Sequence, residues 1–69
     1  SHISVEELSG TSIELLQAVY DDIEHLIECY DCLNDCAVDE GSDDIANYAQ
    51  ERILTLKKHC WMLRSTLED

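Results

Sequence analysis

Apolar residues recur at intervals of three and four along most of the chain, and polar or charged residues separate them. In the first half these apolar positions are Ile13, Leu16, Val19, Tyr20, Ile23, Leu26, Ile27, Tyr30, Leu33 and Ala37. On a helix of 3.6 residues per turn they form one stripe about 140° wide. The pattern therefore predicts an amphipathic helix over residues 11–38 that packs its stripe against another element.

The same spacing returns in the second half of the chain. There the apolar positions are Ile45, Ala49, Ile53, Leu56, Cys60, Leu63 and Leu67. The only turn-like stretch between the two patterns is Asp39–Ser42. Ser42 is suited to cap a helix, and the acids Asp43 and Asp44 would lie near the positive end of its dipole. We therefore predict a second helix over residues 42–67.

Two short motifs suggest how the chain enters the first helix. Thr11 and Glu14 have the spacing of a capping box, in which each side chain accepts from the other residue's backbone. Ser4 and Glu7 repeat that spacing, and Gly10 reads as a stop, so residues 4–9 should form one short helical turn. The chain is thus predicted to be a single all-α domain over residues 1–69. It comprises an N-terminal segment (1–10) and a helical hairpin (11–38 and 42–67).

Two helices alone cannot enclose both apolar stripes, so we expect the hairpin to dimerise into a four-helix bundle. Asn34 falls among the apolar positions of the first helix. A polar residue at such a place fixes register or oligomeric state at some cost in stability. The alternative is that Asn34 lies in a frayed helix end and meets water.

The charge balance narrows the classes of partner. The 69 residues include 16 Asp and Glu but only 4 Lys and Arg, a formal net charge of −12. Direct binding to nucleic acid is disfavoured because phosphates are neutralised by Lys and Arg, and an anionic membrane surface is disfavoured for the same reason. No apolar run is long enough to span a bilayer. Without a basic and apolar leader at the start, we expect a cytoplasmic protein.

The acids are concentrated in one part of the chain. Residues 1–51 contain no Lys or Arg and fourteen acids. Six of these form a ridge on the first helix: Glu14, Asp21, Glu24, Glu28, Asp31 and Asp35. Like charges three or four residues apart destabilise a helix by about 0.2–0.5 kcal/mol per pair. The ridge is either a solvated face or a surface that binds a basic protein. A more specific version of the second alternative is that the ridge imitates the phosphates of nucleic acid.

A second candidate surface lies on the second helix. Leu54 and Trp61 are two turns apart and point away from the main stripe. They are flanked by Lys57, Lys58 and Met62. Trp is enriched among the residues that contribute most to protein–protein affinity. The pair either completes a dimer core or anchors another protein.

The cysteines give the case for a metal or redox role. Cys29, Cys32 and Cys36 follow His25 at helical spacing, a pattern that can hold zinc if another helix supplies a ligand. Within one hairpin Cys60 would lie opposite Asp21, too far away to help. An antiparallel dimer would instead bring Cys60 of the second copy level with Cys32. Ordinary packing of four small apolar side chains is the simpler interpretation.

No phosphate-binding loop, nucleophile elbow or zinc-protease motif is present, so we expect neither an enzyme nor a cofactor. The leading hypothesis is a small acidic homodimeric module that regulates or inhibits a larger protein, such as a basic DNA-binding protein. The alternatives are a metal- or redox-responsive dimer that uses the four cysteines, and a purely structural subunit of an assembly.

Overall fold

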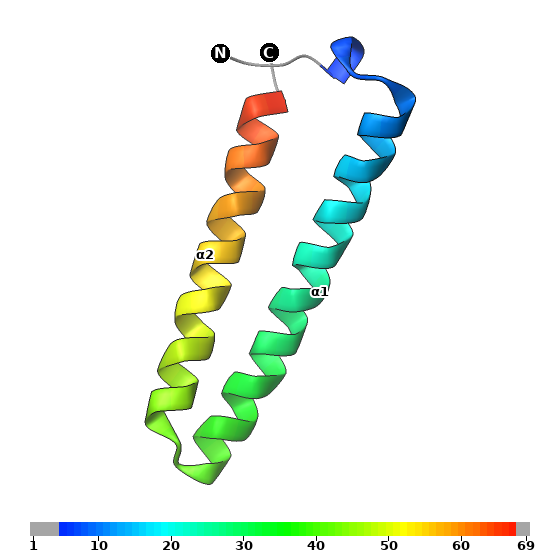
Figure 1. The fold of residues 1–69 in the computed structure, drawn as a ribbon. Helices are drawn as coiled ribbons and strands as arrows, with labels where there is room; N and C mark the ends of the chain where they lie inside the picture. The colour runs from blue at the N-terminus through cyan, green and yellow to red at the C-terminus, as the bar shows by residue number, and fades with distance from the viewer. Residues whose placement is uncertain (1–4, 68–69) are drawn as a thin grey trace.

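The computed structural model describes residues 5–67 and shows a helical hairpin (Figure 1). A short 3₁₀ turn, η1 (Val5–Glu7), precedes two long antiparallel helices, α1 (Gly10–Glu40) and α2 (Asp43–Leu67). The prediction of an all-α hairpin is therefore confirmed. The expected short turn near the N-terminus is present at η1, whereas Ser4, the first residue of its proposed capping box, lies outside the described residues.

The first helix begins earlier than the sequence pattern suggested. Its N-cap is Ser9, whose hydroxyl oxygen accepts a hydrogen bond from the backbone N–H of Ser12 at 3.1 Å. Gly10, expected to act as a stop, is the first residue of α1, and Thr11 lies inside the helix. Ser9 offers the same hydroxyl as Thr11 two residues sooner, so α1 gains two residues at its start without losing a cap.

The turn between the helices is fixed by a left-handed glycine. Gly41 has φ 74°, and its N–H donates to the carbonyl of Val38 at 3.1 Å. The N–H of Ser42 donates to the carbonyl of Ala37 at 2.8 Å. These two bonds form a Schellman motif, which satisfies carbonyls that the end of a helix leaves free. The carbonyl of Ser42 then accepts from the N–H of Ala46 at 3.0 Å and starts α2.

The core between the helices is a narrow seam in which the spacing alternates strictly between three and four residues. On α1 the seam consists of Ile13, Leu16, Tyr20, Ile23, Ile27, Tyr30, Asn34 and Ala37. On α2 it consists of Ala46, Ala49, Ile53, Leu56, Cys60, Leu63 and Leu67. The hydroxyl of Tyr20 donates to the carbonyl of Cys60 at 3.3 Å and sets the two rows in register.

Burial in this seam is uneven along its length. The buried side chains are Ala37, Ala46, Ala49, Ile53 and Leu56, all in the half of the hairpin nearer the turn. Alanines at the contact let two helices approach closely, because the distance between axes depends on the side chains between them. Toward the termini the seam residues are only half-buried, and the helices diverge (Figure 1).

Two helices alone leave part of each apolar stripe exposed, as expected, and the structure shows which residues these are. Val19, Leu26 and Leu33, assigned to the stripe of the first helix, are exposed. Ile45, assigned to the second stripe, is also exposed, and Ala46 takes the core position instead. A single neighbouring helix covers only a narrow seam, whereas the wide stripe of α1 needs a second surface to cover its outer rows.

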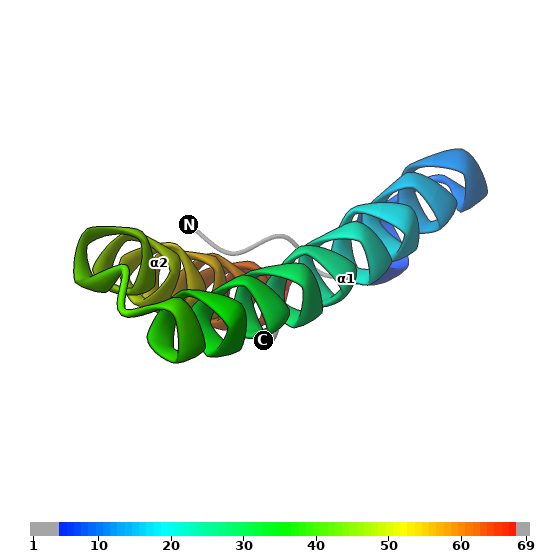
Figure 2. The ribbon, with the colours of Figure 1, turned by 90° about the horizontal axis from the view of Figure 1, so that it is seen from below.

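The hairpin is one helix layer thick. Its Cα atoms extend over 49 × 21 × 11 Å, and the view along the helices from the turn shows them side by side (Figure 2). In the described residues neither broad side of this layer is covered by a further helix or strand (Figure 2). Within these residues, no helix is both long enough and apolar enough to cross a bilayer.

Candidate functional site

Helical geometry sorts the outward side chains onto two broad faces of the hairpin. Residues that directly follow a core residue lie on one face, and residues that directly precede a core residue lie on the other. Because the helices are antiparallel, the residues that follow core residues lie on the same face of the hairpin in both helices. The residues that precede core residues share the other face. Two surface hollows confirm this, since each is lined by residues of one class from both helices, together with core residues.

We call the first of these the acidic face. It carries all nine residues that the sequence suggested for partner binding: Glu14, Asp21, Glu24, Glu28, Asp31, Asp35, Leu54, Lys57 and Trp61. Every one of them is exposed. The six acids run along α1, while Leu54, Lys57 and Trp61 lie on the neighbouring strip of α2. The fold therefore places the two candidate binding surfaces, which are distant in sequence, side by side.

The large apolar side chains of α2 on this face are strongly exposed. Leu54 is 70% exposed and Trp61 is 61% exposed. Leu54 also lines a shallow hollow of about 350 Å³ together with Asp31 of α1 and Gln50 of α2. An acid and an apolar anchor thus share one surface depression, a combination that suits a partner with both cationic and apolar side chains.

Asn34 also lines this hollow. The side-chain amide of Gln50 donates to the Oδ1 atom of Asn34 at 3.0 Å. Asn34 occupies a core row, as expected, and is not in a frayed end, because α1 continues to Glu40. This hydrogen bond joins the two helices at one level and favours a single register.

The opposite side, which we call the apolar face, was not recognised from the sequence. Its rows contain seven large apolar side chains that are 39–63% exposed: Leu15, Val19, Leu26, Leu33, Ile45, Tyr48 and Met62. Cys29 and Cys36 occupy the same rows and are also exposed. Met62, expected beside Trp61, lies on this other face. A second row at three- and four-residue spacing on α1, from Leu15 to Cys36, was the available signal.

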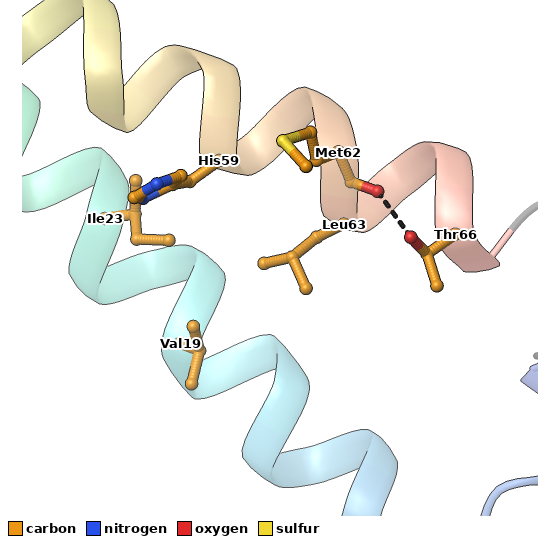
Figure 3. A pocket seen from close by; sticks show the side chains of 6 residues that line it. All are labelled: Val19, Ile23, His59, Met62, Leu63 and Thr66. Atoms are coloured by element: carbon orange, nitrogen blue, oxygen red, sulfur yellow. Dashed lines mark hydrogen bonds between the residues drawn. The ribbon is translucent and has the colours of Figure 1, made fainter.

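A hollow of about 470 Å³ opens on the apolar face where the helices diverge. Val19 and Ile23 of α1 face His59, Met62 and Leu63 of α2 across it (Figure 3). The remaining lining residue is Thr66, whose hydroxyl is occupied by donating to the carbonyl of Met62 at 2.8 Å. The lining is therefore mainly aliphatic, and an apolar side chain would suit it.

Nearer the turn the apolar face carries an aromatic pair. The rings of Tyr30 and Tyr48 meet edge to face with their centroids 6.2 Å apart. A hydrogen bond with Tyr30 is the main cause that raises the pKa of the Tyr48 hydroxyl, and the charge of Arg52 opposes this effect. This pairing holds Tyr48 against the hairpin while more than half of its surface stays exposed.

The cysteines do not come together across the hairpin. Cys29, Cys32, Cys36 and Cys60 are all free thiols. The Sγ atom of Cys29 lies 3.7 Å from Nε2 of His25, one turn earlier on α1. Among the residues that the structure describes, no group of three or more His, Cys, Asp or Glu side chains is placed to hold a metal ion.

Comparisons with protein-family models, with curated proteins and with solved structures give no significant match. The function must therefore be inferred from the two faces themselves.

Proposed function

We propose that this chain is a protein-interaction module that binds a basic protein through its acidic face. The observation that carries this proposal is the juxtaposition of six exposed acids on α1 with exposed Leu54 and Trp61 on α2. We further propose that binding regulates or inhibits the partner by covering its working surface, and that this takes place in the cytoplasm. This is a binding role and not a catalytic one.

The two halves of the acidic face would contribute differently. The acids create a negative potential that attracts a cationic partner over distance and speeds encounter, an effect that salt screens. Trp61 and Leu54 would supply short-range affinity because they bury large apolar areas when a partner covers them. Lys57 directly follows the core residue Leu56 and lies between Leu54 and Trp61 on the acidic face. Its aliphatic stem therefore adds to the apolar strip, while its ammonium group stays at the edge.

The charge also indicates which surface of the partner is covered. With a net charge of −12, the hairpin would be repelled by nucleic acid and attracted to a surface that binds nucleic acid. A rod of regularly spaced carboxylates offers such a surface a substitute for phosphates. A DNA-binding protein inhibited in this way is the partner that we propose.

The proposal can be tested by capture from a lysate of the source organism at low and high salt. The captured protein would be identified, purified and measured for affinity. We expect Trp61→Ala to weaken binding by at least about fivefold, corresponding to about 1 kcal/mol, with helicity unchanged. The matched control is Met62→Ala, the next residue in sequence but on the opposite face, which should bind like the unmodified protein.

A second pair of variants tests the acids. Replacing Glu24 and Glu28 by Gln keeps their shape and removes two charges, so the association rate should fall and its salt dependence should become shallower. Adding the hairpin should also displace the captured protein from DNA. If Trp61→Ala and the Gln variant both bound the partner as tightly and as fast as the unmodified protein, the acidic face would be rejected as the binding surface.

A further inference from the structure

We propose that a second copy of this chain covers the apolar face and that the protein functions as a bundle of two hairpins. This inference does not depend on the proposed function, because it concerns the opposite side of the hairpin. It rests on three properties of the apolar face: its area, its lack of charge and its shape.

The exposed area is what a dimer of this size requires. The chain exposes 5260 Å² in total. A compact monomer of 7.9 kDa is expected to expose about 4,400 Å². The excess, roughly 850 Å², is close to the ~800 Å² that each partner buries in a standard interface. The radius of gyration of 15.5 Å likewise exceeds the ~11 Å of a compact domain of this length.

The apolar face is also the side on which two copies can approach without repulsion. Each copy has a net charge of −12. From Ser12 to Cys36 the apolar face includes one acid on α1, Asp22, and from Ile45 to Thr66 it includes one permanent cation on α2, Arg52. These two charges balance, whereas the opposite face carries six acids on α1 alone. A dimer through the apolar face therefore keeps both acidic faces directed outward.

The shape of the face favours copies that run in opposite directions. The hollow lies in the half near the termini, between Val19 and Met62. In the half near the turn, where the helices are closest, the exposed apolar side chains of this face include Leu33, Ile45 and Tyr48. If two copies had their turns at the same end, the hollows would face each other and stay empty. With the copies reversed, exposed apolar side chains of the turn half of each copy lie over the hollow of the other and can fill it, which is the closer packing.

The oligomeric state can be measured on the full chain by sedimentation equilibrium. The unmodified protein should have twice the mass of one chain. Leu26→Lys places a charge in the middle of the apolar face and should weaken self-association by at least about 30-fold. Leu54→Lys makes the same chemical change on the acidic face, at a more exposed position, and should leave the dimer intact.

Circular dichroism would show whether Leu26→Lys still forms helices. If it does not, Met62→Lys repeats the test from α2 on the same face. A monomer for the unmodified protein, or a dimer that Leu54→Lys disrupts and that both apolar-face variants leave intact, would overturn the proposal.

The orientation has its own measurement. A spin label at Asp39, in a variant whose native cysteines are replaced, marks the turn end of each hairpin. Reversed copies should give a label separation on the order of 40 Å, because the turns then lie at opposite ends of the bundle. A separation of about 20 Å would mean that the turns lie together and would refute the reversed packing.

Discussion

Gly41 is the residue on which the direction of α2 depends. Its φ of 74° is left-handed, and a Cβ added there would meet no atom within 4 Å. Gly41→Ala should therefore cost only backbone strain, about 1 kcal/mol of unfolding free energy, measurable by urea denaturation. Gly10→Ala is the matched control: its Cβ also meets nothing, and its φ is not positive. That change should be neutral or stabilising, and equal losses at both sites would contradict the role of the turn.

Tyr48 provides a residue-scale test in alkaline solution. The hydrogen bond with Tyr30 raises the pKa of Tyr48 above the ordinary value of 10.0, so folding favours the neutral phenol. The stability that this bond gives is fully present below pH 10.0 and is lost as the pH rises through the higher folded pKa. In Tyr30→Phe the pKa of Tyr48 should fall toward its ordinary value. An NMR titration of the tyrosine rings measures this directly, and an unchanged pKa would refute the coupling.

At the scale of elements, the acidic ridge of α1 has a cost that substitution can recover. Its like charges are three or four residues apart from Asp21 through Asp35, each close pair costing about 0.2–0.5 kcal/mol. Glu28→Lys removes two such pairs and creates favourable ones with Glu24 and Asp31. The unfolding free energy should rise by about 1 kcal/mol in thermal or urea denaturation, while binding to a basic partner weakens. Binding that survives this reversal would show that the ridge is only a solvated face.

The two helices could be predicted from sequence because their periodicity is strong and Gly41 and Ser42 separate them clearly. The start of α1 was predicted at Thr11 from its capping-box spacing with Glu14, and this was wrong, because Ser9 is an equally good N-cap nearer the N-terminus. The structure decides in favour of Ser9, whose hydroxyl accepts from the N–H of Ser12. Such boundaries depend on backbone geometry that apolar spacing does not report.

The division of the α1 stripe was harder to foresee. Val19 and Tyr20 are neighbours in sequence and both fit a broad apolar stripe, yet Tyr20 is half-buried and hydrogen-bonded to α2, whereas Val19 is exposed. Which of them belongs to the seam depends on the register of the opposing helix, information that α1 alone does not contain. The acidic face was easier to anticipate, because charge is visible residue by residue. That Trp61 shares a face with Glu24 nevertheless required the antiparallel register.

For the whole molecule, the two proposed interfaces should respond to salt in opposite ways. Two chains of net charge −12 repel each other, so screening should tighten association through the apolar face. A cationic partner is attracted to the acidic face, so the same screening should weaken its capture. Raising the salt from about 0.1 M to about 1 M shortens the screening length from ~10 Å to ~3 Å, enough to separate the two effects.

Both responses can be followed in one titration series, with sedimentation for the dimer and an affinity measurement for the captured partner. Uncharged sucrose at matched osmolality serves as the control, because it does not screen charge. Leu26→Lys should abolish the salt-tightened self-association and still bind the partner. Trp61→Ala should keep the self-association and bind the partner more weakly. If both interfaces weaken with salt, electrostatic attraction would contribute to self-association, and the nearly uncharged apolar face would not be the surface that joins the two copies.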